Sequence, residues 1–242
     1  VRKGYDDLGD GYVGDPLDKD EYFDWLDEFL PELQPDTNVL DLGCNIGVPI
    51  ASRLSATHRV TGVDLSPVAI ASARANAPDA TFIVGDMTEV DFPDGAFAAV
   101  IAFYSIIHVP LAEQRHLFER IAKWLQPGGY FMGTLGKSAW TGTENDWLEP
   151  GGTMYWSHTN EATYVKWLSE AGLTVRWTRF IPEGKGGPFP GPGSKAGRTL
   201  RGLWPVPDPE AVGQHIDEAR ETLVHVDVVS ERPLDLQRHE AV

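Results

Sequence analysis

Residues 38–47 read Asn38-Val39-Leu40-Asp41-Leu42-Gly43-Cys44-Asn45-Ile46-Gly47, and this stretch decides the fold of the 242-residue chain. An apolar run with one carboxylate predicts a buried strand. The two glycines predict a tight turn, because a Cβ there would forbid positive φ and hold a ligand away from the backbone. A helical apolar pattern begins at Val48. The N–H groups at the start of that helix suit an anionic group, such as a phosphate or an α-carboxylate.

Two further strands are predicted at 59–64 and 81–85. The second strand of the chain ends in Asp64, and the third is followed by Asp86 and Met87. In doubly wound nucleotide sites, an acid about 20 residues beyond the glycine turn binds ribose hydroxyls. These acids therefore favour a nucleoside-containing ligand.

The rest of the pattern alternates helices with strands. This alternation predicts a parallel α/β sheet with right-handed crossovers, and the last strand is expected to pair antiparallel with its neighbour. Ser66 and Asn160 are predicted N-caps. Helices are predicted at 20–33, 48–56, 66–77, 111–125, 160–167 and 210–219, and the remaining strands at 96–104, 130–135, 173–181 and 222–229.

Three segments are predicted to lie outside the regular elements. Residues 1–18 form an arm that is either mobile or closed over the site, and residues 136–157 form a loop dense in aromatic side chains. The Gly- and Pro-rich stretch 182–209 is an insertion loop or a lid. We expect one domain over 1–242 that includes this arm and this insertion.

The composition is that of a globular protein, with 42% hydrophobic and 23% charged residues, but the net charge is −16. Such acidity argues against a nucleic-acid partner and against an anionic membrane surface, because both need clustered Lys and Arg. A high-salt cytoplasm and an acidic protein from a GC-rich genome both explain the charge.

The number of cysteines and the length of the apolar runs indicate the cellular compartment. The single cysteine, Cys44, excludes an internal disulfide and fits a reducing compartment. No apolar run reaches about 18 residues, and the start lacks a signal-peptide pattern. We expect a cytoplasmic protein. No cluster has metal-ligand spacing, so no metal is expected.

The ordered motifs resemble the class I S-adenosylmethionine-dependent methyltransferases, specifically the small-molecule branch with the pattern Asp-x-Gly-Cys-x-x-Gly. The likeness runs from Val39 to Leu135 and extends to Gly172. It implies S-adenosylmethionine as cofactor, S-adenosylhomocysteine as product, and a Rossmann-like seven-stranded sheet that is mostly parallel with an antiparallel last strand. A dinucleotide is the main rival, but its Gly-x-Gly-x-x-Gly fingerprint fails at Asn45 and Val48.

The resemblance implies a cofactor role for the residues at the strand tips. Gly43 and Gly47 would admit the methionine end, and Asp41 would orient its ammonium or else cap local N–H groups. Asp64 would accept both ribose hydroxyls, because a carboxylate has two acceptor oxygens. Asp86 would accept from the adenine amino group or else only form a turn. The other cofactor-binding candidates are Tyr5, Tyr12, Cys44, Asn45, Leu65, Met87 and Phe103.

The methyl acceptor is expected beyond the tip of the fourth strand. His108 is the leading general base there, since an imidazole near neutral pKa takes a proton from a hydroxyl, amine or acid. His158 and Tyr104 are further catalytic candidates. His108 has the alternative of merely bonding to a loop, and each aromatic ring that of plain core packing. The substrate-binding candidates are Ser105, Trp147, Tyr155 and Trp156.

The function that follows from the resemblance is methyl transfer to an O or N atom of a small molecule, by in-line displacement. Two alternatives stay open. One is a fold relative that uses S-adenosylmethionine to promote a rearrangement or cyclisation, and the other is a non-catalytic cofactor-binding module. No oligomeric state is predicted.

Overall fold

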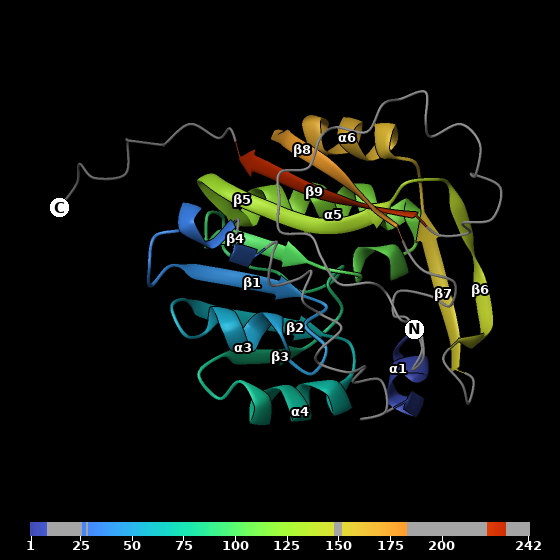
Figure 1. Cartoon of the computed structure of the whole chain (residues 1–242), viewed down its shortest axis with the longest axis horizontal. Coiled ribbons are helices and arrows are strands. Elements are labelled where there is room, and N and C mark those ends of the chain that lie inside the picture. The colour runs from blue at the N-terminus through green and yellow to red at the C-terminus, as the bar shows by residue number, and fades with distance from the viewer. Residues whose placement is uncertain (9–25, 28, 148–151, 183–221, 231–242) are drawn as a thin grey trace, which may run out of the picture.

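The structure is a computed structural model that describes residues 1–8, 26–27, 29–147, 152–182 and 222–230 (Figure 1). The helices are α1 (Arg2–Leu8), η3 (Leu30–Glu32), α3 (Ile50–Leu54), α4 (Pro67–Asn76), η4 (Ile106–His108), α5 (Leu111–Trp124) and α6 (Glu161–Glu170). The strands are β1 (Asn38–Leu42), β2 (Arg59–Asp64), β3 (Thr81–Val84), β4 (Phe97–Ala102), β5 (Leu125–Gly136), β6 (Trp140–Trp147), β7 (Gly152–His158), β8 (Leu173–Pro182) and β9 (Thr222–Ser230).

The main sheet has the strand order β3-β2-β1-β4-β5-β9-β8. Strands β3, β2, β1, β4 and β5 are parallel, and β9 runs antiparallel to both of its neighbours, β5 and β8. In Figure 1 these strands form one twisted sheet across the molecule. The predicted doubly wound α/β fold with an antiparallel last strand is confirmed.

Alternation along β1 divides the core between the two faces of the sheet. Leu40 and Leu42 belong to the cluster that packs against α5 and α6. Val39, which points to the opposite face, packs with α3, α4 and Phe29. Every residue of the central strand β4 is buried, as a parallel strand covered on both faces requires.

The predicted helix signals hold where the structure describes them. The Ser66 hydroxyl accepts the Ala69 N–H at 3.0 Å, and the Asn160 side-chain Oδ1 accepts the Thr163 N–H at 2.9 Å. Gly172 ends α6 with a φ of 84°. Of the predicted helix 20–33, residues 26, 27 and 29 are helical and 30–32 are η3.

Two segments differ from their predictions. Residues 2–8 are helical rather than an irregular arm, and the predicted loop 136–157 contains most of a β6–β7 hairpin. The hairpin forms because Thr, Tyr and Trp favour a pleated, half-buried surface. The predicted insertion 182–209, beyond Pro182, and the predicted helix 210–219 lie outside the described residues.

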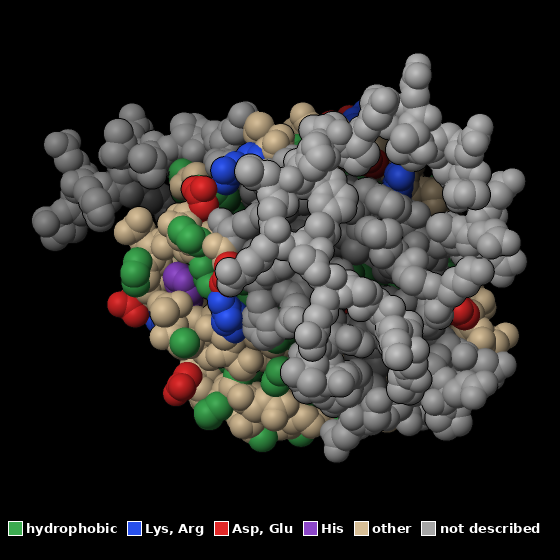
Figure 2. All heavy atoms as spheres, in the orientation of Figure 1, with side chains coloured by type: hydrophobic (Ala, Val, Ile, Leu, Met, Phe, Trp, Pro, Cys, Tyr) green, Lys and Arg blue, Asp and Glu red, His purple; other side chains and the backbone are tan. Residues whose placement is uncertain are grey.

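The described surface mixes charges of both signs. Figure 2 shows acidic and basic side chains interspersed over the described part of the visible face. Within the described residues, no helix combines the length and the apolar character that crossing a membrane demands.

Candidate active site

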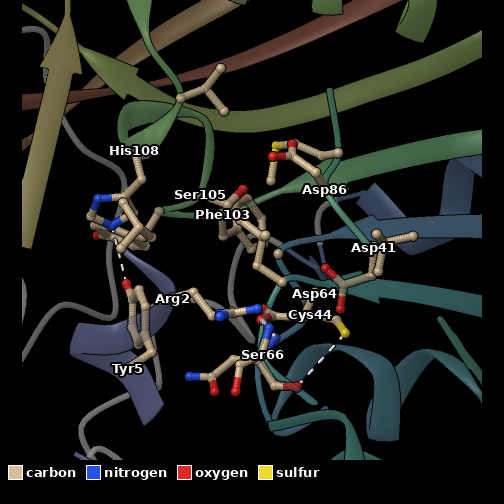
Figure 3. A pocket seen from close by; sticks show the side chains of 18 of the residues that line it. Arg2, Tyr5, Asp41, Cys44, Asp64, Ser66, Asp86, Phe103, Ser105 and His108 are labelled. Carbon is tan, nitrogen blue, oxygen red and sulfur yellow. Dashed lines mark hydrogen bonds between the residues drawn. The ribbon is translucent and has the colours of Figure 1, made fainter. Parts of the chain in front are cut away.

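A cavity of about 420 Å³ lies at the carboxyl ends of the parallel strands, where the order switches between β1 and β4 (Figure 3). Open α/β sheets bind their ligands at such switch points. The strand tips supply one side of the cavity, and α1 with β7 supplies another. Its lining among the described residues is Val1, Arg2, Tyr5, Asp41, Gly43, Cys44, Asn45, Val48, Pro49, Ile50, Val63, Asp64, Leu65, Ser66, Gly85, Asp86, Met87, Thr88, Phe103, Tyr104, Ser105, His108, Val109, Pro110, Glu113 and Tyr155.

The glycine turn after β1 is shaped by a close approach to the tip of β4. Gly43 has a φ of 78°, and a Cβ on it would lie 2.3 Å from the Ser105 Cβ. The Ser105 hydroxyl donates to the Leu42 carbonyl at 2.7 Å, which holds the two strand tips together. Asn45 also has a positive φ, 48°, as the turn requires. Gly47 lies outside the lining, where a Cβ would crowd Ala73 and Phe82 at 3.2 Å.

Asp41 is a buried carboxyl in this lining, with 3% of its surface exposed. Burial, and to a lesser extent the nearby Asp64, raises the pKa of Asp41 to about 7. Its Oδ2 atom has no hydrogen-bond partner among the described residues. Because an unpaired buried oxygen is costly, this position suits a ligand that brings a cation or a donor.

Asp64 braces the turn and the start of α4. Its Oδ2 accepts the Asn45 N–H at 2.9 Å, and its Oδ1 accepts the Ser66 N–H at 2.8 Å. Burial raises the pKa of Asp64 despite these hydrogen bonds. Each oxygen keeps acceptor capacity, so the carboxyl can serve two further donors from a ligand.

Asp86 forms a turn beyond β3. Its Oδ1 accepts the Thr88 N–H at 2.8 Å and the Thr88 hydroxyl at 2.7 Å. This oxygen therefore forms a turn, which is the alternative role that the sequence left open for Asp86. Asp86 and Met87 also line the cavity, on the side of the β3 tip.

His108 is held from both sides of its ring. Its Nδ1 lies 2.8 Å from the Tyr155 carbonyl oxygen, to which it must donate, so the neutral ring presents its lone pair at Nε2. The Tyr5 hydroxyl lies 3.1 Å from Nε2 and donates to it, as Figure 3 shows. Burial lowers the pKa of His108 to about 4. His108 is therefore neutral around pH 7, with Trp156 packed at 4.5 Å between ring centroids.

Helix α1 places Tyr5 over the cavity. A Cβ on Gly4 would lie 2.9 Å from the Thr153 carbonyl oxygen, so glycine allows α1 to approach β7 closely. At the other side, the Ser66 hydroxyl donates to Asp6, which joins α1 to the start of α4. The site thus includes a helix in a segment predicted to be irregular.

Tyr104 lies in the lining with an uncommon backbone conformation. Its φ is 49°, and its N–H donates to the buried hydroxyl of Thr134. Such a conformation costs energy for a bulky residue and is retained where surrounding contacts determine it. It turns the chain sharply between β4 and η4, which carries His108.

The structure does not bring every candidate to the cavity. His158 lies outside the lining, donates from Nδ1 to the Ser138 carbonyl at 2.6 Å, and packs where a Cβ on Gly136 would stand. It therefore bonds to a loop and not to the cavity, and burial lowers the pKa of His158. Trp156 is also outside the lining. Trp147 ends β6, and Tyr12 lies outside the described residues.

Several lining residues were not predicted as site residues. The sequence predicted Ser66 only as an N-cap. Pro110 and Glu113 follow η4 and belong to no motif that would have marked them. Arg2 had no motif either, because α1 was predicted to be irregular. Within the described residues, no group of His, Cys, Asp and Glu side chains is arranged to hold a metal ion.

Comparisons with known proteins agree with this geometry. Residues 39–129 match the methyltransferase domain family. The chain is 34% identical over 131 residues to phosphoethanolamine N-methyltransferase 3 of Arabidopsis thaliana, and 29% identical over 106 residues to sterol 24-C-methyltransferase of Yarrowia lipolytica. These matches cover 50% and 41% of the chain but only 25% and 27% of the relatives, so the chain spans about a quarter of their length.

A solved structure shares the fold over most of its length. N-methyltransferase NodS of Bradyrhizobium japonicum, in complex with S-adenosylhomocysteine, superposes with a TM-score of 0.59 at 14% identity. The likeness covers 91% of this chain and 90% of that one. The domain matched at residues 39–129, this fold and these strand-tip acids together resemble the class I S-adenosylmethionine-dependent methyltransferases.

The residues present fit the cofactor of this class, S-adenosylmethionine. The unpartnered Oδ2 of Asp41 matches a ligand that carries an ammonium. Gly43 lines the cavity, and because it has no Cβ the turn can lie against Ser105 at the tip of β4.

Proposed function

We propose that the chain transfers a methyl group from S-adenosylmethionine to an oxygen or nitrogen atom of a small molecule, by in-line displacement. The observation that carries this proposal is one cavity in which the strand-tip acids and the Tyr5–His108 pair both take part. S-adenosylmethionine supplies a methyl group already activated on a sulfonium. The protein then needs to align the acceptor and exclude water, and alignment alone can lower a barrier by about 7–11 kcal/mol.

Three acids are assigned to the cofactor. Asp41 pairs with the ammonium, because its free oxygen is buried and needs a cation or donor. Asp64 accepts the two ribose hydroxyls while it keeps its bonds to the turn and to α4. Asp86 accepts the adenine amino group through the oxygen that the turn does not use.

The Tyr5–His108 pair is assigned to the acceptor's proton. As the acceptor oxygen becomes an oxonium it turns strongly acidic, and a base with a pKa of about 4 is strong enough to receive its proton. Tyr5 accepts that proton on its oxygen and passes its own proton to Nε2 of His108. A methylated ammonium, with a pKa of about 10, keeps its proton. The pair therefore matters most for a hydroxyl acceptor, whereas an amine must bind in its neutral form.

A small acceptor is supported by the cavity and by what lies over it. The volume of about 420 Å³ must hold both the cofactor and the acceptor, and α1 and β7 contribute to its lining. The relatives named above methylate, by their names, a nitrogen in one case and a carbon in the other. Our choice of oxygen rests on the neutral His108 and its hydrogen-bonded tyrosine, and nitrogen is supported by the relative named as an N-methyltransferase.

The test is a metabolite extract incubated with the purified chain and S-adenosylmethionine labelled in its methyl group. Transfer of label to a small molecule, with an equal amount of S-adenosylhomocysteine, supports the proposal. A product formed without S-adenosylhomocysteine indicates the rearrangement or cyclisation instead. Binding of S-adenosylhomocysteine by calorimetry, without turnover in any extract, indicates a binding module. An absence of binding heat overturns all three readings.

A further inference from the structure

Gln114, on α5, is a fully buried polar side chain whose atoms are all engaged. Its amide nitrogen lies 3.1, 2.7 and 2.5 Å from the carbonyl oxygens of Ile106, Val109 and Ser157, which share its two N–H donors. Its amide oxygen accepts the Tyr164 hydroxyl at 2.7 Å. The side chain of Gln114 is 0% exposed, so solvent does not compete for these hydrogen bonds. Three carbonyl groups from two segments thus converge on one amide.

These carbonyl groups belong to the two segments that hold His108. Ile106 and Val109 stand on either side of His108 in and just after η4. Ser157 lies two residues beyond Tyr155 on β7, and the Tyr155 carbonyl receives the Nδ1 proton of His108. Alternate residues of a strand share an orientation, so Tyr155 and Ser157 present their carbonyls along the same edge. One amide therefore fixes η4 against β7 where the imidazole is held.

The orientation of the amide is itself determined. A tyrosine hydroxyl that donates to the amide oxygen turns the amide nitrogen toward the carbonyl groups. Burial raises the pKa of Tyr164, so that its hydroxyl keeps the proton it donates. The reverse orientation would place the amide oxygen against three carbonyl oxygens.

We infer that Gln114 is a positioning residue, which keeps His108 in the tautomer protonated at Nδ1 by fixing η4 against β7. The catalytic meaning of this inference rests on the proposed function, in which the lone pair at Nε2 must face the cavity. The tautomer itself is a property of the free protein. It is therefore measurable without an acceptor.

A purely structural role for Gln114 would give a different result when the residue is replaced. If Gln114 only satisfies buried carbonyl groups, its removal lowers the melting temperature but leaves the tautomer of His108 unchanged. If it positions η4, its removal lengthens the Nδ1–Tyr155 bond and lets the proton move to Nε2. The two readings differ in the nitrogen spectrum of one histidine.

The experiment is nitrogen NMR on the full chain with its histidines labelled at both ring nitrogens, titrated between pH 4 and 8. His108 is assigned from the signal lost in His108→Gln. The unchanged chain is expected to show a single Nδ1-protonated tautomer down to about pH 5. Gln114→Met, which keeps length but removes every hydrogen bond, is expected to show mixed tautomers and a protonation midpoint at least one pH unit higher.

Two further variants make the result decisive. Tyr164→Phe removes the hydroxyl that orients the amide and is expected to shift the spectrum in the same direction by a smaller amount. It serves as the test if Gln114→Met does not fold. Ile70→Val, a core truncation on the opposite face of the sheet, lowers stability without touching η4 or β7 and is expected to keep the original spectrum. An unchanged His108 spectrum in the folded Gln114 or Tyr164 variant overturns the inference.

Binding of S-adenosylhomocysteine to the same samples separates this inference from the proposed function. We expect the Gln114→Met affinity to stay within threefold of the original, because the cofactor acids lie on other strand tips. An unchanged spectrum with intact binding overturns the role of Gln114 and leaves the proposed function standing. If the original chain does not bind, the proposed function fails while the spectra still decide how His108 is held.

Discussion

The two halves of the cavity are built in different ways. In the cofactor half, Asp64 bonds to N–H groups that lie 2 and 19 residues away in the chain. In the acceptor half, Tyr5 meets His108 across 103 residues, and His108 meets Tyr155 across 47. The first half follows from short motifs at strand tips, whereas the second exists only once α1, η4 and β7 have packed together. Substitutions in the two halves should therefore affect different measurements.

The largest effect is expected from Asp64→Asn, in the cofactor half. The substitution removes the charge and one of the two acceptor oxygens that hold Asn45, Ser66 and the ribose. Hydrogen bonds to charged groups contribute about 1.5–3 kcal/mol each, so the affinity for S-adenosylhomocysteine should fall about 100-fold. Calorimetry measures this fall. Asp79→Asn, which removes an exposed acid outside the cavity, is the matched control and should stay within twofold.

The next effect tests the separation of the halves directly. Tyr5→Phe keeps the ring that α1 places over the cavity but removes the hydroxyl that donates to His108. We expect methyl transfer to slow about 100-fold, the lower end of the range for a lost acid–base group, with the affinity for S-adenosylhomocysteine within threefold. A fall in affinity as large as that of Asp64→Asn would contradict the separation. It would return Tyr5 to the cofactor-binding role that the sequence predicts.

The difference between the halves also explains what the sequence could predict. The strand, turn and helix around Gly43 follow from local periodicity and backbone conformation, and the structure places Asp41, Asp64 and Asp86 at one cavity. The helix α1 was missed because a seven-residue segment containing Gly4 has little helical preference of its own. Helix α1 is held by Ser66 and by its packing on β7, and the local sequence cannot predict contacts with such distant residues.

The raised pKa of Asp41 should make the stability of the cofactor half depend on pH. Its folded pKa of about 7 lies above the ordinary carboxyl value, so the folded chain holds a proton that the unfolded chain has lost between about pH 4 and 7. The free energy of unfolding should therefore decline as the pH rises through this window. Asp41→Asn removes the cost, and we expect it to stabilise the free chain by about 1–3 kcal/mol at pH 8, with little change at pH 4.5.

Denaturant unfolding at the two pH values measures this gain, and binding supplies the second readout. Ionised Asp41 favours the ammonium, so the affinity for S-adenosylhomocysteine should rise from pH 6 to 8 in the original chain. Asp64, the other acid facing this carboxyl, has a raised pKa and contributes to the same rise. The Asp41→Asn variant should therefore show a flatter profile. An equally steep one would assign the pH dependence to Asp64 alone.

The smallest effect is expected from His158, which the sequence predicts as a further base candidate after His108. Both histidines are buried, and both donate from Nδ1 to a backbone carbonyl, but only His108 reaches the cavity. His158→Asn should lower the free energy of unfolding by about 0.5–1.5 kcal/mol, the contribution of one hydrogen bond, and leave methyl transfer within twofold. The same substitution at His108 should slow transfer at least as much as Tyr5→Phe. If the two variants lost activity equally, access to the cavity would not be what separates a catalytic histidine from a structural one in this fold.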